Sequence, residues 1–193
     1  MQINQADLAR ASQAGSLKVS EAFSKFAKQP VSVTVSEAKM VPISAIFEAL
    51  KIGSEKSVVV YTQVISGIPG VSMLMLEREQ ALTFIDLLSG QPRGTTGIML
   101  ESDRSAIKET LNILSNAYLE ALSSLTKQRL LTTIPHMILA GSLQKILEQD
   151  QSLGAGQAVI FKTVLSVATQ KIEATLFMIF SEKLAESLSK INN

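Results

Sequence analysis

Four polar side chains recur at steps of three and four residues within 102–135: Ser105, Glu109, Asn112 and Asn116. Such steps bring side chains to one face of an α-helix. A carboxylate on this face can pair with a cation, and a carboxamide can offer a donor and an acceptor to one water molecule. The neighbouring sequence supplies no nucleophile, metal cluster or strong base. The face would therefore assist a reaction by positioning groups.

The apolar residues of the same stretch predict the helix that would position this face. They lie two positions away from the polar set and keep its rhythm: Ile107, Leu111, Leu114, Tyr118, Leu122 and Leu125. This pattern is typical of an amphipathic helix with one buried stripe. Two positions correspond to a rotation of about 200°, so the polar residues face away from the core. Ser102 or Asp103 can cap its start. Exposed Glu and Asn are ordinary on a helix, so spacing alone does not establish a site.

A longer pattern gives the polar residues a specific meaning. Ser105, Glu109, Asn112 and then Pro135 follow the order and spacing of a signature in the CheC, CheX and FliY family of chemotaxis phosphatases, in which the first position is Asp or Ser. The stretches KETLNILSNAYLEALSSLT, YTQVISG and LMLEREQALTFIDLLSG also resemble that family. The resemblance extends over nearly the whole chain.

The resemblance implies a phosphatase that hydrolyses the aspartyl phosphate of the response regulator CheY. It implies that Asn112 orients the attacking water, as the glutamine of Ras-type GTPases does, and that Glu109 pairs with a lysine of the receiver domain. Ser105 would border the interface with Asn116 in support, and Pro135 would set the start of the following helix or act directly. The receiver supplies Mg²⁺, so no cofactor of the chain's own is expected. The deamidase CheD is a plausible second partner. The alternative is a non-catalytic scaffold that binds a receiver or CheD.

Composition bounds the remaining possibilities. The 193 residues fit a single domain, 1–193, and contain no cysteine. No apolar run reaches the roughly 18 residues of a membrane span, and the N-terminus lacks the apolar core of a signal peptide. Lys and Arg number 18 against 17 acidic residues, which gives no reason to propose nucleic acid or an anionic membrane as a partner. We therefore expect a cytoplasmic protein.

The order of predicted elements indicates an internal duplication, with repeats of approximately 1–92 and 100–193. EAFSKFAKQ aligns with EALSSLTKQ after a shift of 99 positions, and VVVYTQV aligns with AVIFKTV after a shift of 100. Each half reads helix, strand, helix, strand, strand, helix. Pro42 and Pro135 would each open a short helix, the second of them after a strand at 129–134. The fold class is therefore α/β (α+β): one mixed or largely antiparallel sheet shared by both halves, flanked by two long helices, with pseudo-two-fold symmetry.

The duplication predicts a degenerate second site in the first half. A shift of 99 positions places Arg10 opposite Glu109 and Gln13 opposite Asn112, which reverses the charge and lengthens the amide. The same comparison counts six extra residues before Pro42. Small residues at Ser12 and Gly15 would let another helix approach closely.

Three other features suggest no chemistry. His136 is the only histidine, so it has no partner for a metal site or a catalytic triad. GAGQ at 154–157 lacks the Lys-Ser/Thr of a P-loop and is expected to be a loop. Met73, Met75 and Met178 are expected to fill the core.

Overall fold

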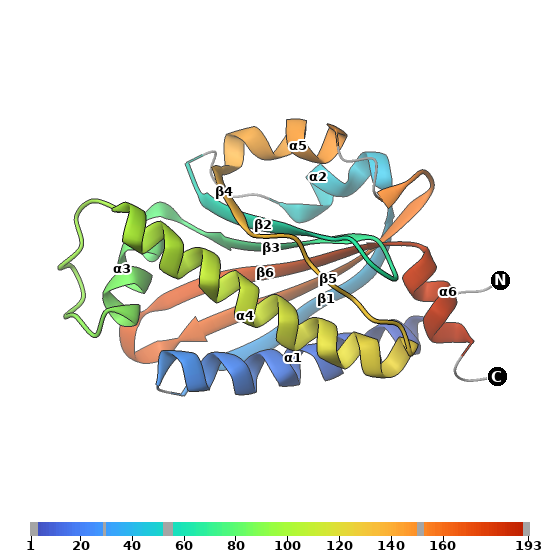
Figure 1. Ribbon diagram of the computed structural model, residues 1–193, viewed down its shortest axis with the longest axis horizontal. Helices are drawn as coiled ribbons and strands as arrows, with labels where there is room; N and C mark the ends of the chain where they lie inside the picture. The colour runs from blue at the N-terminus through green and yellow to red at the C-terminus, as the bar shows by residue number, and fades with distance from the viewer. Residues whose placement is uncertain (1–3, 29, 52–55, 150–152, 191–193) are drawn as a thin grey trace.

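The computed structural model describes residues 4–28, 30–51, 56–149 and 153–190. Its centre is a six-stranded antiparallel sheet in the order β1-β5-β6-β3-β2-β4, with helices on both faces (Figure 1). The strands are β1 (Ser32–Pro42), β2 (Val58–Val64), β3 (Gly70–Leu76), β4 (His136–Leu139), β5 (Gln157–Val167) and β6 (Ile172–Ser181). The α-helices of the described residues are α1 (Gln5–Ala27), α2 (Ile46–Leu50), α3 (Arg78–Leu88), α4 (Glu101–Thr126), α5 (Leu143–Gln149) and α6 (Lys183–Ser189). The predicted α+β fold with one shared sheet is confirmed.

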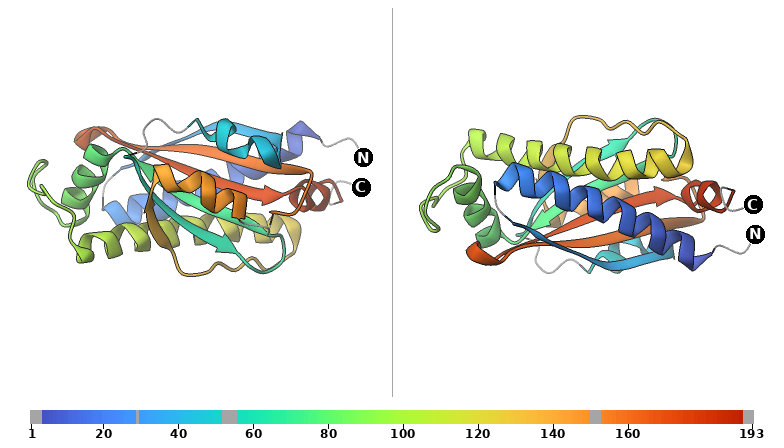
Figure 2. Two further views of the ribbon diagram at one scale, coloured as in Figure 1. Left: turned by 90° about the horizontal axis from the view of Figure 1, so that it is seen from above. Right: turned by 90° about the horizontal axis from the view of Figure 1, so that it is seen from below.

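The sheet has a hydrophobic cluster on each face. The two long helices, α1 and α4, lie side by side across one face, and α2 and α5 cover the other (Figure 2). The larger cluster lies under α1 and α4 and contains Tyr118, Phe161 and Phe180, whereas Phe177 belongs to the smaller cluster under α2 and α5. α3 and α6 add Phe84 and Leu184 to the larger cluster. Burial on both faces explains the nearly continuous apolar character of β3 and β6.

Close packing between α1 and α4 depends on small residues, as the sequence predicted. A Cβ atom at Gly15 would lie 2.4 Å from ring carbons of Tyr118. The Tyr118 ring is fully buried and stacks on Phe161 of β5, with centroids 5.9 Å apart. Ser12 is also fully buried at this face of α1. Gly15 is therefore the place where a side chain on α1 would push α4 away.

The strand order is symmetric about the middle of the sheet. β3 and β6 are neighbours at the centre, β5 and β2 lie outside them, and β1 and β4 form the two edges. The first strand of each half thus pairs with a strand of the other half: β1 with β5, and β4 with β2. This is the two-fold pattern that the predicted duplication implies, while the duplication of the sequence stays a prediction.

Pro135 does not open a helix, so that prediction was wrong. It is followed by the edge strand β4, and a 3₁₀ turn at Ala140–Ser142 precedes α5. The predicted strand at 129–134 is irregular: it runs along the end of β2 with a single bridge, from Thr132 to Val64, and hydrogen bonds such as Ile65 N to Leu131 O at 2.8 Å. Proline has no amide hydrogen to donate to a ladder, and regular pairing begins after it.

The strand register also corrects the comparison of the two halves. Leu139 pairs with Val58 of β2, and Val41 pairs with Ala158 of β5. Since the repeats align residue 58 with residue 158, Leu139 corresponds to Val41, and counting back four residues makes Pro135 correspond to Glu37. Pro42 ends β1 and precedes its own 3₁₀ turn. In this register the two prolines are not equivalent positions, so the six extra residues counted before Pro42 do not mark an insertion of that length.

Candidate functional site

Helix α4 carries the candidate residues on an exposed face. It runs from Glu101 to Thr126 and ends at Lys127, whose φ of 57° is left-handed. Asp103 caps the start by accepting a hydrogen bond from the Leu100 amide at 2.7 Å. Both residues predicted to cap the start lie inside the helix, because the helix begins at Glu101 and its N-cap is Leu100; Asp103 acts from the third helical position. The predicted inner stripe is buried, apart from half-buried Leu125, so the helix cannot rotate without exposing it.

Three side chains of this face form a continuous hydrogen-bonded row, which we call the amide row: Glu109, Asn112 and Asn116. Asn112 donates from Nδ2 to Glu109 Oε2 at 3.4 Å. Asn116 donates from Nδ2 to Asn112 Oδ1 at 3.2 Å. Glu109 and Asn116 are exposed and Asn112 is half-buried. The structure therefore brings the predicted acid and amide together and adds a second amide to them. Ser105, one turn earlier, is also exposed.

Neighbouring charges leave Glu109 available to an incoming cation. The ion pairs that involve α4 lie elsewhere on it: Lys108 to Glu101 at 3.6 Å, and Lys18 of α1 to Glu120 at 3.5 Å. Within the described ranges, no ion pair includes Glu109. Exposed pairs of this kind contribute little to stability, typically about 0–1 kcal/mol.

The edge strand β4 lies beside α4 and brings Pro135 into this region. β4 contacts α4 and pairs with β2. Met137 packs against the larger cluster, on the same face of the sheet as α4. Pro135 is half-buried immediately before this strand. Its place in the fold is thus the entry to an edge strand next to α4.

The corresponding surface of α1 has different chemistry. Arg10 and Gln13 are exposed, and Arg10 Nη2 lies 2.9 Å from Asp7 Oδ1. Leu17 follows at the position that the shift of 99 assigns to Asn116, and its side chain is 62% exposed. Sequence reasoning missed Leu17, although the same shift would have found it. At the three positions where α4 carries an acidic side chain and two amides, α1 therefore carries a basic side chain, an amide and an aliphatic side chain.

The features set aside at the sequence level remain separate from the amide row. His136 is exposed and lies against Tyr61, with ring centroids 5.7 Å apart. Residues 154–156 form an exposed turn, and Met73 and Met178 are buried. No group of three potential metal ligands occurs in the part of the chain that the structure describes. Among the same residues, none of the helices combines the length and the apolar character that a membrane span requires.

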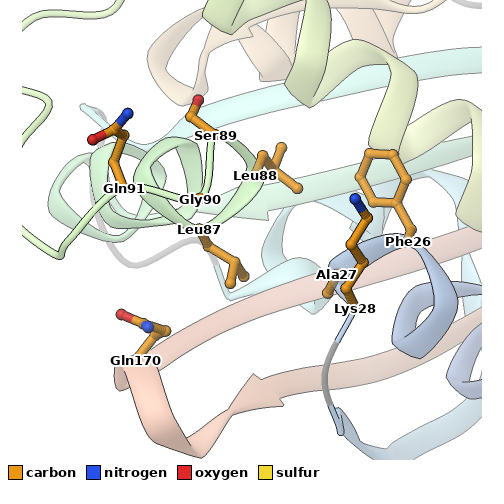
Figure 3. A pocket seen from close by; sticks show the side chains of 9 residues that line it. All are labelled: Phe26, Ala27, Lys28, Leu87, Leu88, Ser89, Gly90, Gln91 and Gln170. Atoms are coloured by element: carbon orange, nitrogen blue, oxygen red, sulfur yellow. The ribbon is translucent and has the colours of Figure 1, made fainter.

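A pocket of about 490 Å³ lies between the ends of two helices, and Figure 3 shows the side chains that line it. It is lined by the C-terminal ends of α1 and α3 together with Gln170, and its apolar lining includes Phe26 and Leu87. No residue of the amide row lines it. The amide row lies on a convex helix surface instead, which suits contact with another macromolecule better than enclosure of a small ligand.

Comparison with solved structures relates this fold to chemotaxis and flagellar proteins. FliY of Thermotoga maritima superimposes with a TM-score of 0.76 at 15% identity, covering 99% of this chain and 98% of that one. The FliM middle domain of Vibrio alginolyticus gives 0.67 at 11% identity, with 96% and 99% covered. CheX in the CheX–CheY–BeF₃–Mg²⁺ complex of Borrelia burgdorferi gives 0.59 at 12% identity, with 94% and 100% covered. No protein-family model and no curated protein sequence matches the chain.

The chain therefore has the CheC-type fold that FliY, CheX and the FliM middle domain share. The resemblance drawn from Ser105, Glu109, Asn112 and Pro135 is confirmed for the fold. Of the three proteins compared here, FliY gives the highest TM-score. At these identities the likeness shows the fold, and activity is a separate proposal.

Proposed function

We propose that this protein hydrolyses the aspartyl phosphate of a CheY-type response regulator. The observation that carries the proposal is the pair of exposed Glu109 and half-buried Asn112, joined by a hydrogen bond on the outer face of the long helix α4. Its support is the order and spacing of the family signature, together with a fold that occurs in CheX bound to CheY. The reaction would take place in the cytoplasm, where receiver domains reside.

In the proposed reaction this chain would form no covalent bond with the substrate. A water oxygen attacks phosphorus, the bond from phosphorus to the aspartyl oxygen breaks, and inorganic phosphate and a free carboxylate leave. The receiver contributes the phosphorylated aspartate, Mg²⁺ and a lysine. Phosphoryl transfer depends mainly on position and on stabilised charge, so one well-placed group can accelerate it greatly. This chain would supply that group and the surface that docks it.

Asn112 has the chemistry to place the water. Its carboxamide can accept a hydrogen bond from the water and donate another to it or to a phosphoryl oxygen. The helix that carries it is packed against both α1 and the sheet, so its backbone is held to the precision that such positioning needs. Glu109 would pair with the receiver lysine and set the docking register. Ser105 lies one turn away and would border the same interface.

The alternative function is a binding module without turnover. FliM shares this fold, and FliM of H. pylori forms complexes with SpeE and with FliG. Under that alternative the α4 surface binds a receiver or a CheD-type partner but does not accelerate phosphate loss. CheD remains a proposed second partner on the basis of the sequence resemblance. Binding with unchanged phosphate lifetime would favour this alternative.

Phosphate release from phosphorylated CheY, with and without this protein, tests the proposal. The wild-type protein should shorten the lifetime of the phosphorylated receiver. Asn112→Ala should lower the rate by about 10²–10³, as removal of one well-placed transition-state group does. Its thermal unfolding should be unchanged because the side chain lies on the outer face of α4. Gln13→Ala is the matched control on α1 and should retain the wild-type rate. A fully active Asn112→Ala protein would refute the mechanism.

A further inference from the structure

We infer that Asn116 is a positioning residue that sets the orientation of the Asn112 carboxamide. The inference rests on the proposed function and extends it to a third member of the amide row. Asn116 stands one helical turn beyond Asn112 and donates from Nδ2 to Asn112 Oδ1 at 3.2 Å. It would not touch the water itself. Its effect would pass through the amide that it holds.

The two hydrogen bonds of Asn112 select one of its two amide orientations. In the observed orientation, Nδ2 faces the Glu109 carboxylate at 3.4 Å and Oδ1 faces the Asn116 amide group. Rotating the amide by 180° would set Oδ1 against a carboxylate, which only accepts. It would also break the hydrogen bond from Asn116 Nδ2 to Asn112 Oδ1, and the Asn116 amide would have to turn as well to accept one from Asn112. The acid on one side and the amide on the other therefore act together.

The groups left over on Asn112 match the needs of one water molecule. A primary amide has two N–H donors and two acceptor positions on its oxygen. Glu109 uses one donor and Asn116 uses one acceptor position. One donor and one acceptor position remain, and the row fixes where each of them points. A freely flipping amide would present the correct arrangement only part of the time.

The side chain of Asn116 contributes little to the stability of the folded protein. Its side chain is exposed, and a single exposed hydrogen bond adds little to folding. Asparagine is also a relatively poor residue in a helix interior. The corresponding residue of α1 is Leu17, which has no donor, and it accompanies the altered pair Arg10 and Gln13. The hydrogen-bond donor at this position thus occurs on α4, together with the acid and the amide, and is missing on α1, where both of these residues differ.

Single-turnover decay of phosphorylated CheY at saturating concentrations of this protein tests the inference. Asn116→Asp is the informative variant, because the side chain keeps its shape but only accepts hydrogen bonds. It should lower the saturated rate by roughly 10–100-fold, since a misplaced reactive group costs on that order. The concentration at half-saturation should stay within about twofold of wild type, as expected when only the bound-state step is affected. Asn116→Gln keeps a donor and should restore part of the rate.

Glu120→Gln serves as the control one turn further along α4. Glu120 is exposed and pairs with Lys18 outside the amide row, so its variant should keep the saturated rate. A wild-type saturated rate in Asn116→Asp, together with a slow Asn112→Ala, would overturn the inference and leave the proposed function standing. A change in half-saturation alone would also overturn it, because Asn116 would then act in docking. A wild-type protein without turnover would refute the proposed function and this inference together.

Discussion

Glu109 and Asn112 differ in the step at which each would act. A docking carboxylate contributes to forming the complex, whereas a water-positioning amide contributes once the complex exists. Their hydrogen bond joins these roles in one structure, since Glu109 Oε2 accepts from Asn112 while the rest of the carboxylate faces solvent. Kinetics under binding and saturating conditions can therefore separate the two residues.

Glu109→Ala should weaken receiver binding more than it slows the bound-state reaction. The reason is that an ion pair to the receiver lysine acts mainly on complex formation. Single-turnover rates measured over a range of protein concentrations will show a raised half-saturation point and a saturated rate much nearer to wild type than that of Asn112→Ala. Should the full defect persist at saturation, Glu109 has a chemical role in the reaction.

At the scale of the elements, the position of α4 depends on its contact with α1. Gly15 is the closest approach, and the buried Tyr118 ring that faces it already stacks on Phe161. The ring has no empty space to move into without disturbing the larger cluster. A side chain at Gly15 would therefore displace α4, and with it the amide row.

Gly15→Val should destabilise the protein by about 1–3 kcal/mol, the usual cost of overpacking a filled core. A Cβ at this position would lie 2.4 Å from the ring carbons Cε1 and Cζ of Tyr118, and valine has no strong helix preference to offset that clash. Urea unfolding followed by circular dichroism measures the loss. Gly97→Val is the control, because a Cβ there has no neighbour within 4 Å. Equal stability of the two variants would show that α1 and α4 tolerate separation.

The loop between the halves is held by a buried carboxylate. Asp86 of α3 is 1% exposed and accepts from the amides of Gly94 at 2.7 Å, Thr95 at 3.2 Å and Thr96 at 2.8 Å. Burial raises the pKa of Asp86, but the hydrogen bonds from the Thr96 side chain and the three amides outweigh it and hold the pKa below its ordinary value.

The ionised form of Asp86 should make the free energy of unfolding depend on acid pH. Because the folded pKa is depressed, the stabilisation is fully present above the unfolded value of about 3.9 and is lost as pH falls through the folded value. Asp86→Asn should remove this part of the acid loss and lower stability at pH 7, since an amide nitrogen cannot accept from a backbone N–H. Urea unfolding between pH 7 and the acid range tests both effects. Glu79→Gln, exposed on the same helix, should leave the profile unchanged, and an Asp86→Asn profile parallel to wild type would contradict the assignment.

At the scale of the whole molecule, a symmetric sheet carries two unlike helix surfaces. The α4 surface has an acid and two amides, and the α1 surface has Arg10, Gln13 and Leu17 at the corresponding positions. Arg10 would repel a receiver lysine. Gln13 is one methylene longer than asparagine, so its amide would overshoot the water position. Since the strand register gives no six-residue insertion before Pro42, the side chains themselves would account for the expected inactivity of the α1 surface.

The α1 surface should therefore contribute no turnover. With the Glu109→Ala/Asn112→Ala variant, phosphorylated CheY should lose its phosphate at the rate seen without this protein. With the Arg10→Ala/Gln13→Ala variant, it should lose its phosphate as fast as with the wild-type protein. Both rates come from the same phosphate-release assay. Residual activity in the first variant that disappears when Arg10 and Gln13 are also replaced would reveal a working second site.

The sequence by itself determined the features that depend on local periodicity. The three-four spacing around Leu111 and Leu114 determines which face of α4 is buried, so the place of Glu109, Asn112 and Asn116 on the opposite face follows without any tertiary information. The small residues of α1 likewise predicted a close helix contact. The element order, together with hairpin-like turns, was enough to predict one shared sheet that is mixed or largely antiparallel.

Only the tertiary structure decided what depends on contacts between distant residues. The pairing of β1 with β5 and of β4 with β2 arises from backbone hydrogen bonds between residues that are 75 or more positions apart in the chain, and no local pattern specifies that register. The sequence analysis therefore placed Pro135 wrongly at a helix start and compared it with Pro42. In the sheet, Pro135 stands at the entry to an edge strand, and the register makes it correspond to Glu37 of the first half. The direction of each hydrogen bond in the amide row could not be predicted from the sequence either. An amide side chain has two orientations, and the groups that surround it in space determine which one is adopted.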